Sequence, residues 1–226
     1  MLIEIFKANF GELLKAGFMY TVPLAIIAFT ISLLLAVTSA FIGMSESKNF
    51  FIHWILQPLN KFYVWLFRST PLLLQLFIIF YGIPKAFPGF SLSTWAAAII
   101  GFSLNTGAYS SEIIRGAILG VPQGQFESAR SLGLSPLKTF RYVVLPQAFR
   151  IAIPPLSNSF IALVKDTSLA SAITMVEIMQ TAQQIAAANF QPLDTYLIAA
   201  FIYAIFSTVL SQLQKVLEKH FKKFDS

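Results

Sequence analysis

The chain has 226 residues, of which 56% are hydrophobic and 12% are charged, and its mean hydropathy is +0.70. An ordinary soluble domain carries about 25% charged residues, so this composition excludes a soluble globule and favours an all-α membrane protein of about five spans. The net charge of +6 is spread over several loops, which argues against nucleic-acid binding, and the absence of cysteine excludes disulfides, thiolate metal sites and cysteine nucleophiles.

The apolar run from Val22 to Phe41 predicts the first span. Before it, the acidic residues Glu4 and Glu12 accompany Lys7 and Lys15, so the chain does not start with the basic region of a cleaved signal peptide. The run is also longer than the apolar region of such a peptide. We therefore expect an uncleaved first span.

The segment from 49 to 68 places polar residues on one helical face and aromatic residues elsewhere. This pattern predicts a helix that lies at the interface or enters the membrane at a slant. Ser69, Thr70 and Pro71 then predict a helix start, with a hydroxyl cap and proline in the first turn. The alternative is one long helix kinked at Pro71. The second span is expected to end near 82–84.

The third span is expected from Leu92 to Ile114. It is less apolar than the first because several small and polar residues interrupt it. Such residues belong on a helix that faces other helices or a water-filled path. They are Ser103, Asn105, Thr106, Ser110, Ser111 and Glu112.

The segment from 115 to 150 is polar and basic, with Glu127 as its single acid. Cytoplasmic loops of membrane proteins accumulate lysine and arginine, so this segment is expected to be cytoplasmic. Within it we expect a short helix from 123 to 132, closed by Gly133 as the first residue after the C-cap.

Ser135 and Pro136 open another helix by cap and first-turn chemistry. We expect Pro146 and the pair at 154–155 to interrupt this helix. The apolar stretch from 155 to 164 covers only about half a hydrocarbon core. It therefore predicts a broken or re-entrant element, which is tolerated at membrane depth only where protein or water surrounds it.

A break between helices is expected from Lys165 to Ser168, with a helix resuming from Leu169 to Ala188. Thr167 or Ser168 could cap that second helix and leave free N–H groups facing a transport path. The last span is expected from 195 to 213, followed by a basic tail.

The distribution of charge predicts the topology. The 115–150 loop and the tail are basic, whereas the 166–194 stretch holds three acids and no base. The positive-inside rule then places the N-terminus outside and the C-terminus in the cytoplasm.

A long, gapped motif in the basic loop carries the first functional hypothesis. The loop contains Glu127-Ser128-Ala129, three residues, Gly133, nine residues and then Val143-Val144-Leu145-Pro146. This resembles the EAA loop of ABC importer permeases, with Ser128 for the first alanine and Val143 for isoleucine. The resemblance implies that the short helix docks in a cleft of a cytoplasmic ATPase. The coupling residues it implies are Glu127, Ser128, Ala129, Gly133, Val143, Leu145 and Pro146.

Four further segments resemble the polar amino-acid subfamily of these permeases: Arg68–Leu76, Ala108–Ile118, Leu145–Asn158 and Lys165–Leu169. The resemblance covers about residues 15–215. It implies one transmembrane domain of the MetI-like permease fold over 1–226, with a coupling loop at 120–150. The implied function is ATP-driven import of polar amino acids across the bacterial inner membrane by alternating access.

The same resemblance implies several partners. They are two ATPase subunits that bind ATP and magnesium, an extracytoplasmic amino-acid-binding protein and a second permease copy or a paralogue. This chain has no phosphate-loop motif, so we expect it to bind no cofactor and to hydrolyse no ATP. The choice between homodimer and heterodimer stays open, as does the identity of the amino acid.

Ionisable and polar residues within or beside the spans are candidates for the substrate path. The candidates are Arg68, Asn105, Ser110, Glu112, Lys165, Asp166, Thr167 and Ser168. Lys165 and Asp166 could meet the carboxylate and ammonium of an amino acid. The alternatives are a structural Arg68–Glu112 or Lys165–Asp166 pair and, for Asn105 and Ser110, interhelical hydrogen bonds.

Two other classes of protein account for less of the sequence. An ion-coupled carrier or channel would explain the spans and the broken helix, but it leaves the Glu127–Pro146 pattern without a purpose. A membrane enzyme is disfavoured, because His53 and His220 lie in separate segments and no metal spacing or nucleophile motif occurs.

Overall fold

The computed structural model describes residues 2–45 and 49–222, and these residues contain helices but no strand. The helices are α1 (Leu2–Ala16), α2 (Val22–Met44), α3 (Gln57–Ser69), α4 (Leu72–Phe77), α5 (Ile83–Ala86), α6 (Thr94–Leu119), α7 (Gln123–Ser131), α8 (Pro136–Thr139), α9 (Leu145–Asp166), α10 (Ile178–Asn189) and α11 (Pro192–Lys222). Short π-helical segments, η1 (Gly17–Thr21), η2 (Ile52–Leu56), η3 (Ile78–Gly82) and η4 (Phe140–Val144), and one 3-10 segment, η5 (Thr167–Ile173), join some of them.

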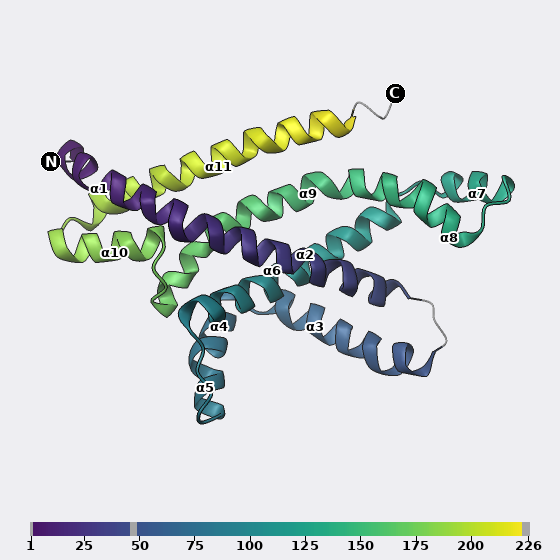
Figure 1. Ribbon diagram of the computed structural model, residues 1–226, viewed down its shortest axis with the longest axis horizontal. Helices are drawn as coiled ribbons and strands as arrows, with labels where there is room; N and C mark the ends of the chain where they lie inside the picture. The colour runs from purple at the N-terminus through teal and green to yellow at the C-terminus, as the bar shows by residue number, and fades with distance from the viewer. Residues whose placement is uncertain (1, 46–48, 223–226) are drawn as a thin grey trace.

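Figure 1 shows an elongated bundle in which the long helices run roughly along one axis. The α7–α8 hairpin lies at one end, and the N-terminus lies beside α10 at the other. The C-terminal ends of α2 and α11 point toward the hairpin end. The bundle therefore has two chemically different ends, one of which carries the basic loop.

Two helices of the described chain are long and apolar enough to cross a membrane, Glu4–Met44 with 41 residues and Pro192–Lys219 with 28. Two bent pairs could each add one span: Ile52–Ser69 with Leu72–Ala86, and Pro136–Ile173 with Ile178–Asn189. The more polar α6 has 26 residues, enough for about 39 Å of helix, and packs between α2, α3 and α9. The first helix is longer than predicted, because α1 and η1 run directly into α2.

Small residues let α2 and α6 pack closely. Ala25, Ala28, Ser32 and Ala36 lie at helical spacing on α2 and are all buried. Ser103 Oγ on α6 donates a hydrogen bond to the Ala28 carbonyl oxygen at 3.2 Å. Without a hydrophobic force between helices in lipid, such close approach and interhelical bonding stabilise the pair.

We expect Gly107→Val to destabilise the fold by about 1–3 kcal/mol, because overpacking a tight helix contact forces neighbours to move. A β-carbon at Gly107 would lie 2.8 Å from Tyr63 Oη and 3.1 Å from Leu35 Cβ. Gly116→Val is the matched control on the same helix, since a β-carbon there meets nothing within 4 Å. The melting temperature in detergent measures both. Equal losses for the two variants would contradict this account.

The predicted helix start near Pro71 is right in position but wrong in its chemistry. α3 ends at Ser69, α4 begins at Leu72, and the two halves meet at 111°, so a single kinked helix is excluded. Pro71 is the N-cap rather than a first-turn residue. Thr70 Oγ1 donates to the Leu66 carbonyl oxygen at 2.8 Å, which closes α3 instead of capping α4.

The predicted proline interruptions are wrong. Pro146 lies in the first turn of α9, and Pro154 and Pro155 lie inside this helix. The stretch from 155 to 164 is therefore part of a continuous helix rather than a short re-entrant element. Proline removes a backbone donor, but in membrane helices neighbouring groups and local π adjustments satisfy the freed groups. One such π segment, η4, directly precedes α9.

The predicted break from Lys165 to Ser168 is also displaced. There α9 only tightens into the 3-10 segment η5, and the chain bends by 50° later, between Ile173 and Ile178, where Thr174 has a φ of +60°. A continuous helix over 169–188 is therefore wrong. Thr167 does not cap a following helix, because its hydroxyl donates to the Val164 carbonyl oxygen at 2.7 Å.

The cap of α10 is Glu177, a residue that the sequence argument did not single out. Its carboxylate accepts hydrogen bonds from the backbone N–H groups of Met179 at 2.9 Å and Gln180 at 2.7 Å. It also accepts one from the hydroxyl of Tyr203 on α11, at 2.6 Å. Glu177 is fully buried, so these three donors replace its lost hydration and tie α10 to α11.

Candidate functional site: a polar cleft and an exposed hairpin

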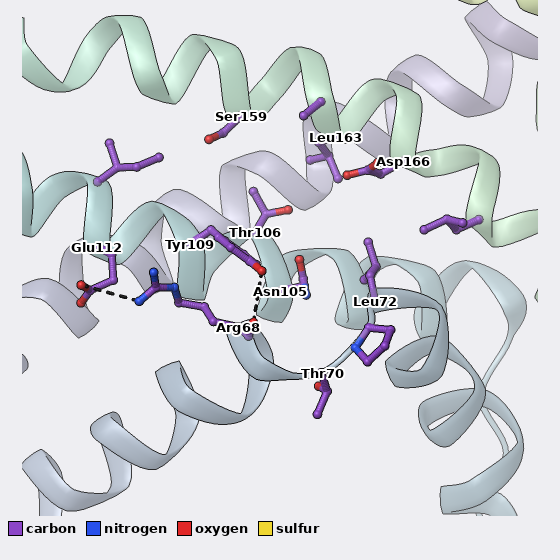
Figure 2. Close-up of a pocket in the computed structure, with 14 residues that line it drawn as sticks. Arg68, Thr70, Leu72, Asn105, Thr106, Tyr109, Glu112, Ser159, Leu163 and Asp166 are labelled. Carbon is purple, nitrogen blue, oxygen red and sulfur yellow. Dashed lines mark hydrogen bonds and ion pairs between the residues drawn. The ribbon is translucent and has the colours of Figure 1, made fainter.

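A cleft of about 640 Å³ opens between the end of α3, the start of α4, and helices α6 and α9 (Figure 2). The chemistry of the cleft is set by its polar side chains, which come from three of these elements and the connection between α3 and α4. They are Arg68, Thr70, Asn105, Thr106, Tyr109, Glu112, Ser159 and Asp166. The cleft therefore combines charged and polar side chains with an apolar lining that includes Leu72, Ile113 and Leu163.

The α3–α4 bend is held by two amide side chains. Proline at 71 and the sharp turn leave carbonyl groups at the end of α3 without helical partners. Gln75 Nε2 donates to the carbonyl oxygens of Phe67 and Thr70, both at 3.1 Å. Asn105 Nδ2 on α6 donates to the Phe67 carbonyl oxygen and to Gln75 Oε1, both at 3.0 Å. This network fixes the wall of the cleft that carries Arg68.

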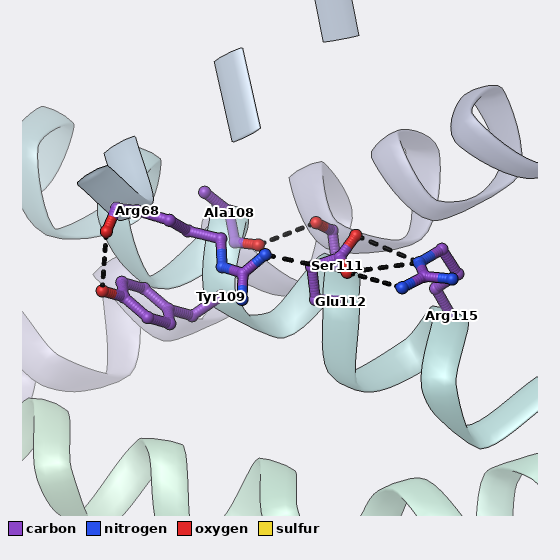
Figure 3. Close-up of polar contacts among 6 residues, drawn as sticks. All are labelled: Arg68, Ala108, Tyr109, Ser111, Glu112 and Arg115. Carbon is purple, nitrogen blue, oxygen red and sulfur yellow. Dashed lines mark hydrogen bonds and ion pairs between the residues drawn. The ribbon is translucent and has the colours of Figure 1, made fainter. Parts of the chain in front are cut away.

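Glu112 is the centre of an ion network on that wall (Figure 3). Its Oε2 lies 2.8 Å from Arg115 Nη2 and 3.7 Å from Arg68 Nη1. Tyr109 donates its hydroxyl to the Arg68 carbonyl oxygen at 3.2 Å, and the Arg68 guanidinium lies 5.6 Å from the Tyr109 ring centre. Two cations face one anion, so the wall keeps an excess positive charge beside the cleft.

Asp166 supplies the opposite charge from α9. Figure 2 shows it on the α9 side of the cleft, across from Arg68 and Asn105 on the other wall. No ion pair joins Asp166 to Lys165 among the described residues, and Lys165 is exposed outside the cleft. The acidic group is thus available to a cation that enters the cleft.

The structure brings four of the eight predicted path residues together: Arg68, Asn105, Glu112 and Asp166. The other four do not line the cleft. Ser110 is buried, and its hydroxyl has no hydrogen-bond partner in the described part of the chain. Thr167 is buried as well, while Ser168 is half-buried in η5.

Sequence reasoning did not place Tyr109 and Ser159 in the site. Both follow from helical spacing, because Tyr109 lies between Asn105 and Glu112 at positions i, i+4 and i+7, and Ser159 lies seven residues before Asp166. Gln75 was also missed, although it is an amide in an otherwise apolar run.

The α7–α8 hairpin forms a second candidate site, at one end of the bundle (Figure 1). As predicted, a short helix ends just before Gly133, which has a φ of +73°. Gly133 N–H donates to the Arg130 carbonyl oxygen and Leu134 N–H to that of Ala129, at 2.9 and 3.1 Å. These two bonds are the pattern of a Schellman cap.

The surface of the hairpin is apolar at its tip. Leu132 is 80% exposed and Leu137 is 76% exposed. Of the motif residues, Ala129 is buried and Val143 half-buried, whereas Glu127, Ser128, Leu145 and Pro146 are exposed. A polar, basic hairpin that exposes large apolar side chains is typical of a protein-docking element.

Comparison with known proteins gives consistent results along the chain. Residues 44–223 match the family described as the binding-protein-dependent transport system inner membrane component. The chain is 45% identical over 224 residues to the L-cystine transport system permease protein TcyB of Bacillus subtilis, with 98% of this chain and 92% of the relative covered. It is 37% identical to the glutamine transport system permease protein GlnP of Escherichia coli over 169 residues, with 75% and 77% covered.

Solved structures of amino-acid ABC transporters also resemble this chain. A chain from the crystal structure of an amino acid ABC transporter with histidines has a TM-score of 0.87 and 30% identity, covering 95% of this chain and 96% of that one. An inward-facing MetNI methionine ABC transporter, at 18% identity and a TM-score of 0.67, shares the fold. The chain therefore belongs to the family of inner membrane components of binding-protein-dependent transport systems, within the amino-acid ABC permeases.

Proposed function

We propose that this chain is the membrane-spanning subunit of an ATP-driven importer that moves polar amino acids into the cytoplasm by alternating access. The observation that supports this proposal most directly is the arrangement of charges in the cleft. An α-amino acid is a zwitterion, and the cleft sets the excess positive charge of Arg68, Glu112 and Arg115 against Asp166 on α9. The substrate carboxylate would meet Arg68 and its ammonium would meet Asp166, with charge-assisted hydrogen bonds at both ends.

Coupling to ATP is assigned to the α7–α8 hairpin and the residues from Glu127 to Pro146. ATP and magnesium would bind to a separate ATPase subunit, and the hairpin would dock in its cleft by the exposed side chains of Leu132 and Leu137. An amphipathic helix that enters a groove needs apolar anchors of this kind. The Schellman cap at Gly133 supports the role, because it gives the hairpin one defined shape.

The proposed assembly contains two ATPase subunits, a second permease copy or a paralogue, and an extracytoplasmic amino-acid-binding protein. The cleft is open to one side, and a second permease subunit would close it into a path. The hairpin end would face the cytoplasm, since Arg130, Lys138 and Arg141 lie on it and Lys215 lies near the C-terminus. The N-terminus would then be outside, and reporters fused to each terminus test this orientation.

Reconstitution in proteoliposomes tests the proposal. The chain, an ATPase subunit and candidate binding proteins are combined, and uptake of labelled cystine and glutamine is measured with ATP or a non-hydrolysable analogue inside. We expect uptake that requires both ATP hydrolysis and a binding protein. Uptake driven by an ion gradient without an ATPase would reject the proposal in favour of a secondary carrier.

A further inference from the structure

The connection between α10 and α11 presents a bulky aromatic side chain in an unusual backbone conformation. Phe190 has a φ of +55° and is 86% exposed. Helices commonly end with a left-handed residue, but that residue is usually glycine or asparagine, because a β-carbon is disfavoured there. Phenylalanine at this position costs the fold free energy without burying its ring, so the fold alone does not explain it.

The backbone around Phe190 is held by hydrogen bonds that involve Asn189, Gln191 and Thr195. Asn189 Oδ1 accepts a hydrogen bond from the Gln191 N–H at 2.8 Å, and Asn189 Nδ2 donates to Thr195 Oγ1 at 3.2 Å. Thr195, which is fully buried, donates its hydroxyl to the Gln191 carbonyl oxygen at 2.9 Å. The ring therefore projects from a fixed base rather than from a mobile loop.

The tip around Phe190, at the connection between α10 and α11, has one charged residue close by in the sequence, the half-buried Asp194. The exposed neighbours of the ring are small or apolar: Ala187, Ala188, Pro192 and Leu193. No lysine or arginine occurs between Lys165 and Lys215. The tip lies at the end of the bundle opposite the α7–α8 hairpin (Figure 1). The inference rests on the proposed function and orientation, which place this end outside the cytoplasm.

We propose that Phe190 is an anchor by which the soluble binding protein docks on this chain. Interfaces draw most of their energy from a few large anchors surrounded by contacts that contribute little binding energy, and the exposed ring of Phe190 beside small or apolar neighbours has that form. A rigid base lowers the entropy lost on binding.

The membrane surface is the less fitting partner. Lipid is fluid and requires no fixed geometry, so a strained backbone gains nothing there. Interfacial anchors are also typically tryptophan or tyrosine.

Phe190→Gly separates docking from folding. Glycine accepts a φ of +55° without strain, so the variant keeps the connection and loses only the ring. The probe is the binding protein that supports uptake in the reconstitution above, loaded with its amino acid. Its Kd for the complete importer is measured in nanodiscs and in detergent, beside the melting temperature. Leu197→Ala is the control, since Leu197 is exposed on α11.

We expect Phe190→Gly to raise the Kd at least about tenfold in both media, with an equal or higher melting temperature, and Phe190→Trp to bind more tightly than Phe190→Gly. The control should bind as the wild type does. An unchanged Kd would overturn the inference. A weaker Kd with a lower melting temperature would make the role structural, and a defect confined to nanodiscs would make Phe190 a lipid anchor. If no binding protein supports uptake by the wild type, the proposed function itself fails before Phe190 is tested.

Discussion

Leu132→Asp is expected to abolish ATP-driven uptake while the chain still inserts in the membrane at normal levels. Leu132 is 80% exposed at the end of α7, so its side chain contributes little to the fold. Loss of an apolar anchor from a docked interface costs about 2–4 kcal/mol, or roughly 30- to 1,000-fold in affinity. Co-purification of the ATPase and uptake in proteoliposomes measure the effect.

Leu132→Met is the matched control for this experiment. It keeps an apolar side chain of similar volume, so ATPase binding should change little. If Leu132→Asp retained the ATPase and transported normally, the hairpin tip would not be the docking surface. If the variant failed to accumulate, a folding role for the tip would replace the docking role.

Asp166→Asn is expected to lower uptake at least about tenfold without changing the protein level or assembly with the ATPase. A hydrogen bond to a charged group contributes about 1.5–3 kcal/mol, and the asparagine would keep the shape of the side chain without its charge. Lys165→Gln is the control, because this neighbour also loses one charge but lies outside the cleft. Its uptake should stay near that of the wild type.

Two results would contradict the substrate role of Asp166. Normal uptake by Asp166→Asn would exclude it directly. A fall in protein level, restored by exchanging Lys165 and Asp166, would favour a structural pair. No such pair within 4.0 Å is present among the described residues, so we do not expect the exchange to restore anything.

Local chemistry predicted the boundaries of several elements correctly. The starts near Pro71 and Pro136 and the end before Gly133 depend on φ restrictions that act within a few residues. The helix through Pro154 and Pro155 was mispredicted for the opposite reason. The rule that proline breaks a helix assumes that water can satisfy the freed carbonyls, and within a helix bundle in lipid the chain stays helical instead.

The part of the candidate site that lies on a single helix, α6, was predictable from the sequence. Asn105 and Glu112 share a face of α6, so their joint position follows from spacing alone. The opposite wall was not predictable in detail, because it depends on where α9 ends. Gln75 shows a further limit: its role arises from carbonyl groups left open by the distant geometry of the α3–α4 bend.

The close packing of α2 on α6 has a consequence for synthesis. Residues 45–93 separate the two helices, so α2 enters the bilayer before its partner exists. At roughly 5–20 residues per second, the delay is about 2–10 s. During that interval its polar groups face lipid. The hydroxyls of Thr30, Ser32 and Thr38 are bonded to carbonyl oxygens of α2 itself, at 2.7–3.0 Å, so they need no partner helix to be satisfied. Three of the four hydroxyl side chains of α2 are therefore satisfied in lipid before α6 arrives, and the exception is Ser39, whose hydroxyl has no hydrogen-bond partner among the described residues.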